Sequence, residues 1–252
     1  MAKLTGQTIA ASYDQLLIVG DANGITATAQ AVESADTGGN ASLLYLSTTA
    51  VYSPGIAGTS NTVFGKLAGD AMHANADYNT VFGEGALGGT MTAAADNNVA
   101  IGYQAGAAIT SGAGNTIGQN AAVSFGANSD NVVIGQVAMD AADQTETGNV
   151  AIGNSAMGAV DEGSGGSADY NVAIGFGALT GGDFTSASSS LNDNVAIGTN
   201  ALNSTGTNAS LGQIAIGRDA LTALTTGGNN VAIGFQAMAE ETTGSNNTVV
   251  GH

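Results

Sequence analysis

Few residues in this chain could perform acid–base or nucleophilic chemistry. The 252 residues include two histidines and no cysteine. A serine nucleophile needs an adjacent base that a third group orients, and neither His73, in a polar loop, nor His252 belongs to a recurring motif that would position it. The adjacent acids Asp161–Glu162 and Glu240–Glu241 could supply the two carboxylates of glycoside hydrolysis. Both pairs lie in polar loops, where we expect them to face solvent. We therefore predict no catalytic residue and no enzyme activity.

Metal and phosphate chemistry have equally little support. Oxygen-rich loops such as ALGGTMTAAADNN (86–98) could bind calcium. The glycine-rich nonapeptide of calcium-binding β-rolls is absent, so we interpret these loops as solvated turns. Glycine-rich segments such as TGGN have no lysine and no following helix, so they are not phosphate cradles. We predict neither a bound metal nor a cofactor.

The charge balance excludes several classes of partner. Twenty acids stand against three bases, which gives a net charge of −17. Nucleic acids and anionic membranes are bound by clustered Lys and Arg, and the bases here, Lys3, Lys66 and Arg218, are far apart in the sequence. No apolar run approaches the roughly 20 residues that span a bilayer. The first 20 residues also lack the apolar core of a secretory signal. We expect a protein made in a cytoplasm that binds no nucleic acid and inserts into no membrane.

The elements that must position any site come from one short repeat. Its consensus is N-V-A-I-G-x-x-A-[LM], followed by a polar loop, and internal repeats of this length indicate stacked units. The ten copies end at Gly65, Gly83, Gly102, Gly135, Gly153, Gly175, Gly198, Gly217, Gly234 and Gly251. Between Gly102 and Gly135 we expect two degenerate turns, which end at Gly118 and Gly126.

Within each copy, β-branched residues alternate with Ala, and this period of two predicts a strand. One unit cannot bury its apolar stripe alone, so successive units are expected to stack in parallel as a β-solenoid. We predict that Val99 and Ile101 point into a narrow core, that Ala100 points away from it, and that Gly102 adopts a positive φ. The asparagines that begin the strands should form an amide ladder. The candidates are Asn98, Asn131, Asn149, Asn171, Asn194 and Asn230.

Composition predicts a second packing surface outside each coil. With 39 glycines, 5% aromatic and 9% charged residues, the chain cannot fill a broad core at native density. About ten or eleven coils spaced by ~4.8 Å would form a rod about 50 Å long. The Ala-lined outer faces, Ala173 among them, then predict a homotrimer. The edge of the last coil, at Val249 and Val250, is expected to need a cap.

The repeat resembles the head repeat of trimeric autotransporter adhesins, whose chains form left-handed parallel β-rolls packed as trimers. The resemblance covers residues 58–252 and implies an all-β, left-handed β-roll that assembles as a homotrimer. Coil lengths vary more here than in that family. Since we find none of that family's secretion signal, coiled-coil stalk or membrane anchor, we do not expect a bacterial surface adhesin.

Residues 1–57 are similar to the opening of tail-fibre and other virion proteins of tailed bacteriophages, most clearly at SYDQLL and NASLLYLS. A short amphipathic stretch, 9–17, should precede two or three strands there. The similarity implies a region that attaches to other virion proteins. It also implies a structural virion protein, assembled in the host cytoplasm, that forms a projecting fibre, spike or capsid decoration. The alternative is a tail-fibre adhesin that binds a host surface receptor.

A hexapeptide acyltransferase is a further alternative, because I-G-x-x-A-x resembles the unit of that left-handed β-helix. Eighteen residues would be three hexapeptides. However, the motif appears on one face only and the spacing drifts from 17 to 23 residues. The catalytic histidine of such an enzyme would have to be His73.

Overall fold

The computed structural model describes residues 30–33, 43–46, 59–141, 146–160, 167–181, 190–204 and 210–252. The chain divides into two compact units, Met1–Pro54 and Gly55–His252. In the first unit, β1 (Gln30–Glu33) pairs antiparallel with β2 (Leu43–Leu46). The predicted amphipathic stretch at residues 9–17 lies outside the described residues.

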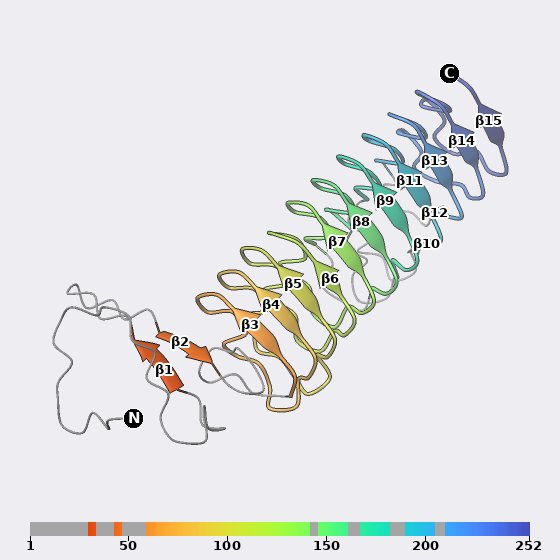
Figure 1. Ribbon diagram of the computed structural model, residues 1–252. Helices are drawn as coiled ribbons and strands as arrows, with labels where there is room; N and C mark the ends of the chain where they lie inside the picture. The colour runs from red at the N-terminus through yellow and green to blue at the C-terminus, as the bar shows by residue number, and fades with distance from the viewer. Residues whose placement is uncertain are drawn as a thin grey trace, which may run out of the picture. The chain divides into compact units, whose positions relative to one another are not determined.

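The second unit is a parallel β-solenoid, in which each coil contributes one short strand to a single 11-stranded sheet (Figure 1). β10 (Leu191–Asn192) and β12 (Ser210–Leu211) form a separate parallel pair. No helix occurs in the described segments. The all-β fold and the parallel stacking of the repeats are therefore confirmed. The strands of the large sheet are β3 (Thr62–Phe64), β4 (Thr80–Phe82), β5 (Val99–Ile101), β6 (Thr116–Ile117), β7 (Val132–Ile134), β8 (Val150–Ile152), β9 (Val172–Ile174), β11 (Val195–Ile197), β13 (Ile214–Ile216), β14 (Val231–Ile233) and β15 (Thr248–Val250).

The register of this sheet does not depend on the length of the coil. Val172 pairs with Val195, twenty-three residues later, and Ile214 pairs with Val231, only seventeen residues later. In both cases the middle Ala of one strand lies beside the middle Ala of the next. Extra residues are therefore accommodated in the loops, and each strand residue still pairs with the equivalent residue of the next coil.

The orientation that we predicted for the strand residues is wrong. Ala100 is fully buried, whereas Ile101 is 53% exposed and Val99 is only half-buried. The same pattern, with a buried middle residue between two outer residues, holds from β3 to β14 wherever the strand has three residues. Ala173 is consequently inside the coil and lines no outer face. The interior is too narrow for a β-branched residue in most coils, so Ala takes the inner position and the larger Val and Ile face outward.

Larger side chains fill the rest of the interior from other parts of the coil. The first source is the Leu or Met after the second conserved Ala, as at Leu179 and Met157, both fully buried. The second source is a single apolar residue in the loop, such as Ile109 or Val160. Each coil is thus filled by one or two large side chains and several alanines, which is the thin packing that the composition predicted.

The apolar residue in the loop also accounts for a second wrong prediction, which concerns the segment that ends at Gly126. Of the two degenerate turns expected between Gly102 and Gly135, the one that ends at Gly118 is present as the coil of β6, and the one that ends at Gly126 forms no coil of its own. Phe125, which precedes Gly126, is fully buried in the loop of that coil. The Gly126 carbonyl accepts a hydrogen bond from the Thr110 N–H of the preceding coil (2.9 Å). The VSFG segment therefore supplies a core side chain and begins no new coil.

The predicted amide ladder runs through the whole solenoid. At Asn149, the side-chain nitrogen Nδ2 and the backbone N–H both donate to Oδ1 of Asn131, at 3.1 and 2.9 Å. Nδ2 also donates to the Ala168 carbonyl, three residues before the next ladder position at Asn171 (2.7 Å). Its own Oδ1 accepts from the backbone and the side chain of Asn171, at 2.9 and 3.0 Å. Every member from Asn79 to Asn230 is buried, Gln213 included, and the ladder satisfies polar groups that would otherwise be costly inside the coil.

The glycine that follows each three-residue strand of the large sheet adopts the positive φ that we predicted, for example +137° at Gly153. A Cβ at this position would collide with the carbonyl of Gly175, the corresponding glycine of the next coil. The glycines therefore serve two purposes, since they permit the turn and let successive coils approach closely.

Candidate functional site

The two histidines are not brought together. His73 is exposed in a loop, and its Nδ1 accepts a hydrogen bond from the Asn75 N–H (3.1 Å). The His252 ring lies against the Phe235 ring in a tilted arrangement, with ring centroids 5.2 Å apart. Phe235 in turn lies under the Arg218 guanidinium, 4.4 Å from Cζ to the ring centroid. Arg218, Phe235 and His252 each follow the glycine after one of three successive strands. His252 therefore belongs to a row of surface contacts between coils, and His73 makes a local contact within its loop.

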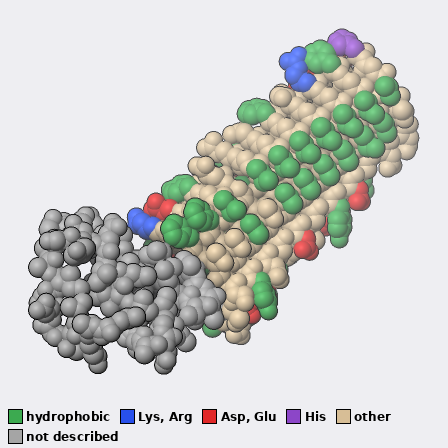
Figure 2. All heavy atoms as spheres, in the orientation of Figure 1, with side chains coloured by type: hydrophobic (Ala, Val, Ile, Leu, Met, Phe, Trp, Pro, Cys, Tyr) green, Lys and Arg blue, Asp and Glu red, His purple; other side chains and the backbone are tan. Residues whose placement is uncertain are grey.

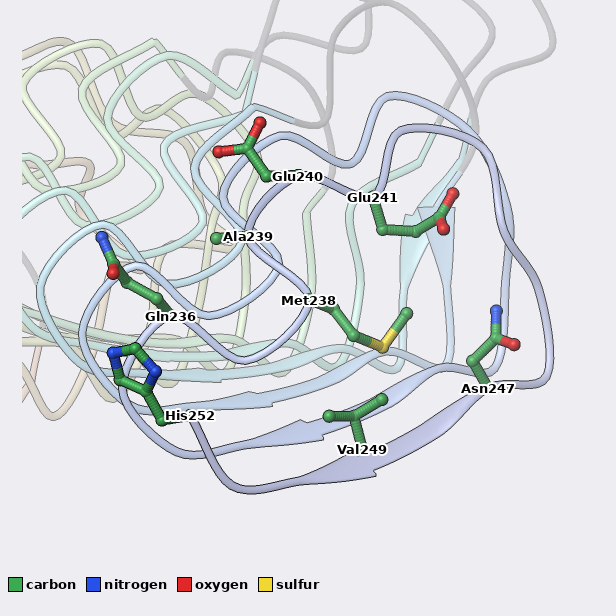
Figure 3. Close-up of a pocket in the computed structure, with 8 residues that line it drawn as sticks. All are labelled: Gln236, Met238, Ala239, Glu240, Glu241, Asn247, Val249 and His252. Carbon is green, nitrogen blue, oxygen red and sulfur yellow. The ribbon is translucent and has the colours of Figure 1, made fainter.

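Of the two acid pairs, Asp161–Glu162 lies outside the described residues. Glu240 and Glu241 line an open hollow at the last described coil, together with Met238, Val249 and neighbours, but their carboxylates point in different directions (Figure 3). Oε1 of Glu241 accepts hydrogen bonds from the backbone N–H groups of Thr243 (3.0 Å) and Gly244 (2.7 Å). These bonds hold the pKa of Glu241 below its ordinary value. Glu241 thus caps a turn in this structure.

Loop 86–98, the candidate calcium loop, uses its acid within the chain. Oδ1 of Asp96 accepts a hydrogen bond from the Asp77 N–H of the preceding coil (2.7 Å). No group of three or more His, Cys, Asp or Glu that could hold a metal ion occurs within the described residues. The described part of the chain also contains no helix of the length and apolar character needed to cross a membrane.

The most prominent surface feature is the outer side of the 11-stranded sheet, which we call the sheet face. Two rows of side chains, most of them hydrophobic and the rest Thr, follow it along the rod (Figure 2). One row is formed by the first residue of each strand: Thr62, Thr80, Val99, Thr116, Val132, Val150, Val172, Val195, Ile214, Val231 and Thr248. The other is formed by the third residue of each three-residue strand: Phe64, Phe82, Ile101, Ile134, Ile152, Ile174, Ile197, Ile216, Ile233 and Val250.

Several members of the sheet face are strongly exposed for their size. Phe64 and Phe82 are 52% and 55% exposed, and their rings stack with centroids 5.1 Å apart. Ile101 is 53% exposed and Ile134 is 46% exposed. Neither row contains a charged residue. An uncharged apolar strip of this kind is suited to contact with another macromolecule rather than to catalysis.

Sequence reasoning missed the sheet face because it placed Val and Ile inside the coil. The signal that could have revealed it is the second half of the repeat, x-x-A-[LM], whose Leu or Met already supplies a large core residue. With that residue inside, little interior volume remains for Val and Ile.

Comparison of the chain with protein-family models, with curated proteins and with solved structures finds no match.

Proposed function

We propose that this chain is a structural protein of a tailed-bacteriophage virion. In this proposal it forms a homotrimeric, left-handed β-roll that projects from the particle as a fibre, spike or capsid decoration. Residues 1–57 attach it to other virion proteins. The chain is assembled in the host cytoplasm and needs no cofactor.

The observation that carries the proposal is the continuous hydrogen-bonded stack of coils. Eleven strands pair in one sheet, and the amide ladder links neighbouring coils inside it. Such a solenoid has a fixed length and resists bending, because each coil is bonded to both neighbours along its strand and through its core. These properties suit a spacer or projection. The resemblances of the repeat and of residues 1–57 add the phage context and the trimer.

Particle analysis tests this proposal directly. Purified virions of the phage that encodes the chain should contain it as an abundant component by mass spectrometry. Antibodies raised against residues 58–252 should label the same structure on every particle in electron micrographs. Absence of the chain from purified virions would refute the proposal. A matched antibody against a non-structural protein of the same phage provides the background.

Host-receptor binding is a second candidate, which exposed aromatic residues on the rod favour. Tyr170 and Phe176 flank β9 and are 63% and 59% exposed. Exposed aromatic rings are common anchors in binding surfaces. Binding of the purified rod to host cells, weakened at least tenfold in Tyr170→Ala/Phe176→Ala and unchanged in Thr90→Ala, would favour the adhesin over a purely structural role. The hexapeptide acyltransferase has no comparable support, because that fold carries strands on three faces and His73 is held in an exposed turn.

A further inference from the structure

We propose that the sheet face is the surface through which copies of this chain contact one another, three around a common axis with their coils level. This inference rests on the self-association in the proposed function and assigns it to a surface. It replaces the Ala-lined surface that the sequence suggested, since those alanines are buried inside the coil.

Charge is the first argument for a contact between copies. Each chain has a net charge of −17, so two copies repel one another through most of their surfaces. The two rows of the sheet face contain only Val, Ile, Thr and Phe. Identical chains can therefore approach along this strip without bringing like charges together. Burial of the apolar side chains of the strip lowers the free energy of the assembly.

Size is the second argument. Eleven strands spaced by about 4.8 Å give a strip about 50 Å long, and three residues per strand make it about 10 Å wide. The flat footprint is about 500 Å², and the ridged side-chain surface is larger. A standard interface buries about 800 Å² of accessible surface per partner. The strip therefore approaches the size of a specific interface, with the hydrophobic character of the buried centre of one.

Periodicity is the third argument, and it identifies the partner as this same chain. The strip presents the same two positions in coil after coil at the spacing of neighbouring strands. A partner that fits it over its whole length must share that repeat, and another copy of the solenoid does. Packed sheets lie about 10 Å apart, which is also about the width of the strip. Three strips can therefore form a triangular prism. In this prism, the row of first strand residues of one copy contacts the row of third strand residues of the next copy.

The test introduces charge into the strip where the side chains are already exposed. Ile101→Lys/Ile134→Lys changes two residues that are 53% and 46% exposed in the single chain, so each chain should still fold. The matched control, Thr90→Lys/Ala93→Lys, adds the same charge at two exposed loop positions. By sedimentation, the wild type and the control should have about three times the chain mass of 24.3 kDa, and the strip variant should have the mass of one chain. Circular dichroism should show the same strand content in all three.

The possible outcomes separate the surface from the assembly. A wild type with the mass of one chain would overturn both this inference and the proposed trimer. A trimeric wild type with an equally trimeric strip variant would overturn only the assignment of the surface. A dimeric wild type would overturn the three-fold arrangement.

If the strip variant fails to fold, cross-linking tests whether the sheet face is the contact between copies. The natural chain has no cysteine, so Ile152→Cys introduces a single thiol in the strip and Ala93→Cys introduces one in an exposed loop. A short bis-maleimide should join two chains through the first thiol and not through the second. Equal cross-linking of both variants, or of neither, would overturn the proposal.

Discussion

Replacement of one ladder asparagine is the sharpest test of how the solenoid is stabilised. Asn149 is fully buried, and its side chain takes part in four hydrogen bonds, two as donor and two as acceptor. Asn149→Ala removes all four. It leaves the Ala168 carbonyl and the Asn171 N–H without their partners inside the coil.

The expected loss of stability follows from those two groups. Each buried polar group left without a hydrogen bond costs about 1–3 kcal/mol, so we expect Asn149→Ala to lower the free energy of unfolding by about 4 kcal/mol. This is a large share of the roughly 5–15 kcal/mol that stabilises a typical domain. Water that enters the cavity would reduce the loss, and a poorly collapsed cavity would increase it.

The chain itself provides the control. Gln213 occupies the same column and keeps three equivalent bonds, through its backbone N–H to Asn194, through Nε2 to the Gly227 carbonyl and through Oε1 from the Asn230 N–H. Asn149→Gln should therefore cost less than half as much as Asn149→Ala. Urea unfolding followed by circular dichroism measures both variants. Equal losses, or a loss below about 1 kcal/mol in Asn149→Ala, would show that the ladder contributes little to stability.

Three further changes test the interior and one turn. Ala173→Asp places a carboxylate inside a coil and should destabilise the chain by at least about 3 kcal/mol in thermal unfolding, whereas Ala93→Asp, in an exposed loop outside the sheet face, should cost far less; similar losses would contradict the burial of Ala173. Glu146→Gln should raise the unfolding free energy, because both carboxylate oxygens are buried without a hydrogen-bond partner within the described residues; a lower value would indicate that the charge is compensated. The backbone bonds that lower the pKa of Glu241 stabilise its turn above the unfolded pKa, and this contribution is lost as pH falls through the lower, folded pKa. After correction for intrinsic rates, amide exchange at Gly244 should then accelerate on acidification in the wild type and not in Glu241→Gln. If Glu241→Gln showed the same pH dependence as the wild type, the carboxylate would not be the cap of this turn.

The sequence alone was sufficient to predict features that depend only on stacking. A phrase that returns with the same residues places Asn on Asn and Gly on Gly once the coils are parallel. The ladder at Asn149 and the positive φ at Gly153 therefore followed from the repeat. No knowledge of the loops was needed, because their variable lengths leave the strand register unchanged.

Features that depend on interior volume could not be obtained in the same way. Alternation shows that a strand has two faces, but it does not show which face is inside. The general tendency of Val and Ile to be buried favoured the wrong face at Ala100 and Ala173. The VSFG segment was predicted to form a separate turn for the same reason. The burial of Phe125 depends on the space left inside one particular coil, which the sequence does not show.

The constancy of register across coils of different length has a consequence for how such a chain can change over generations. Every coil begins with a variant of the same short sequence, so unequal exchange between two copies of the coding segment would add or delete one complete coil. The strands that become neighbours would still align residue for residue, as Val172 and Val195 do across the longest paired loop. Rod length can thus change in steps of about 4.8 Å, and each added coil brings core residues that already pack in the existing coils.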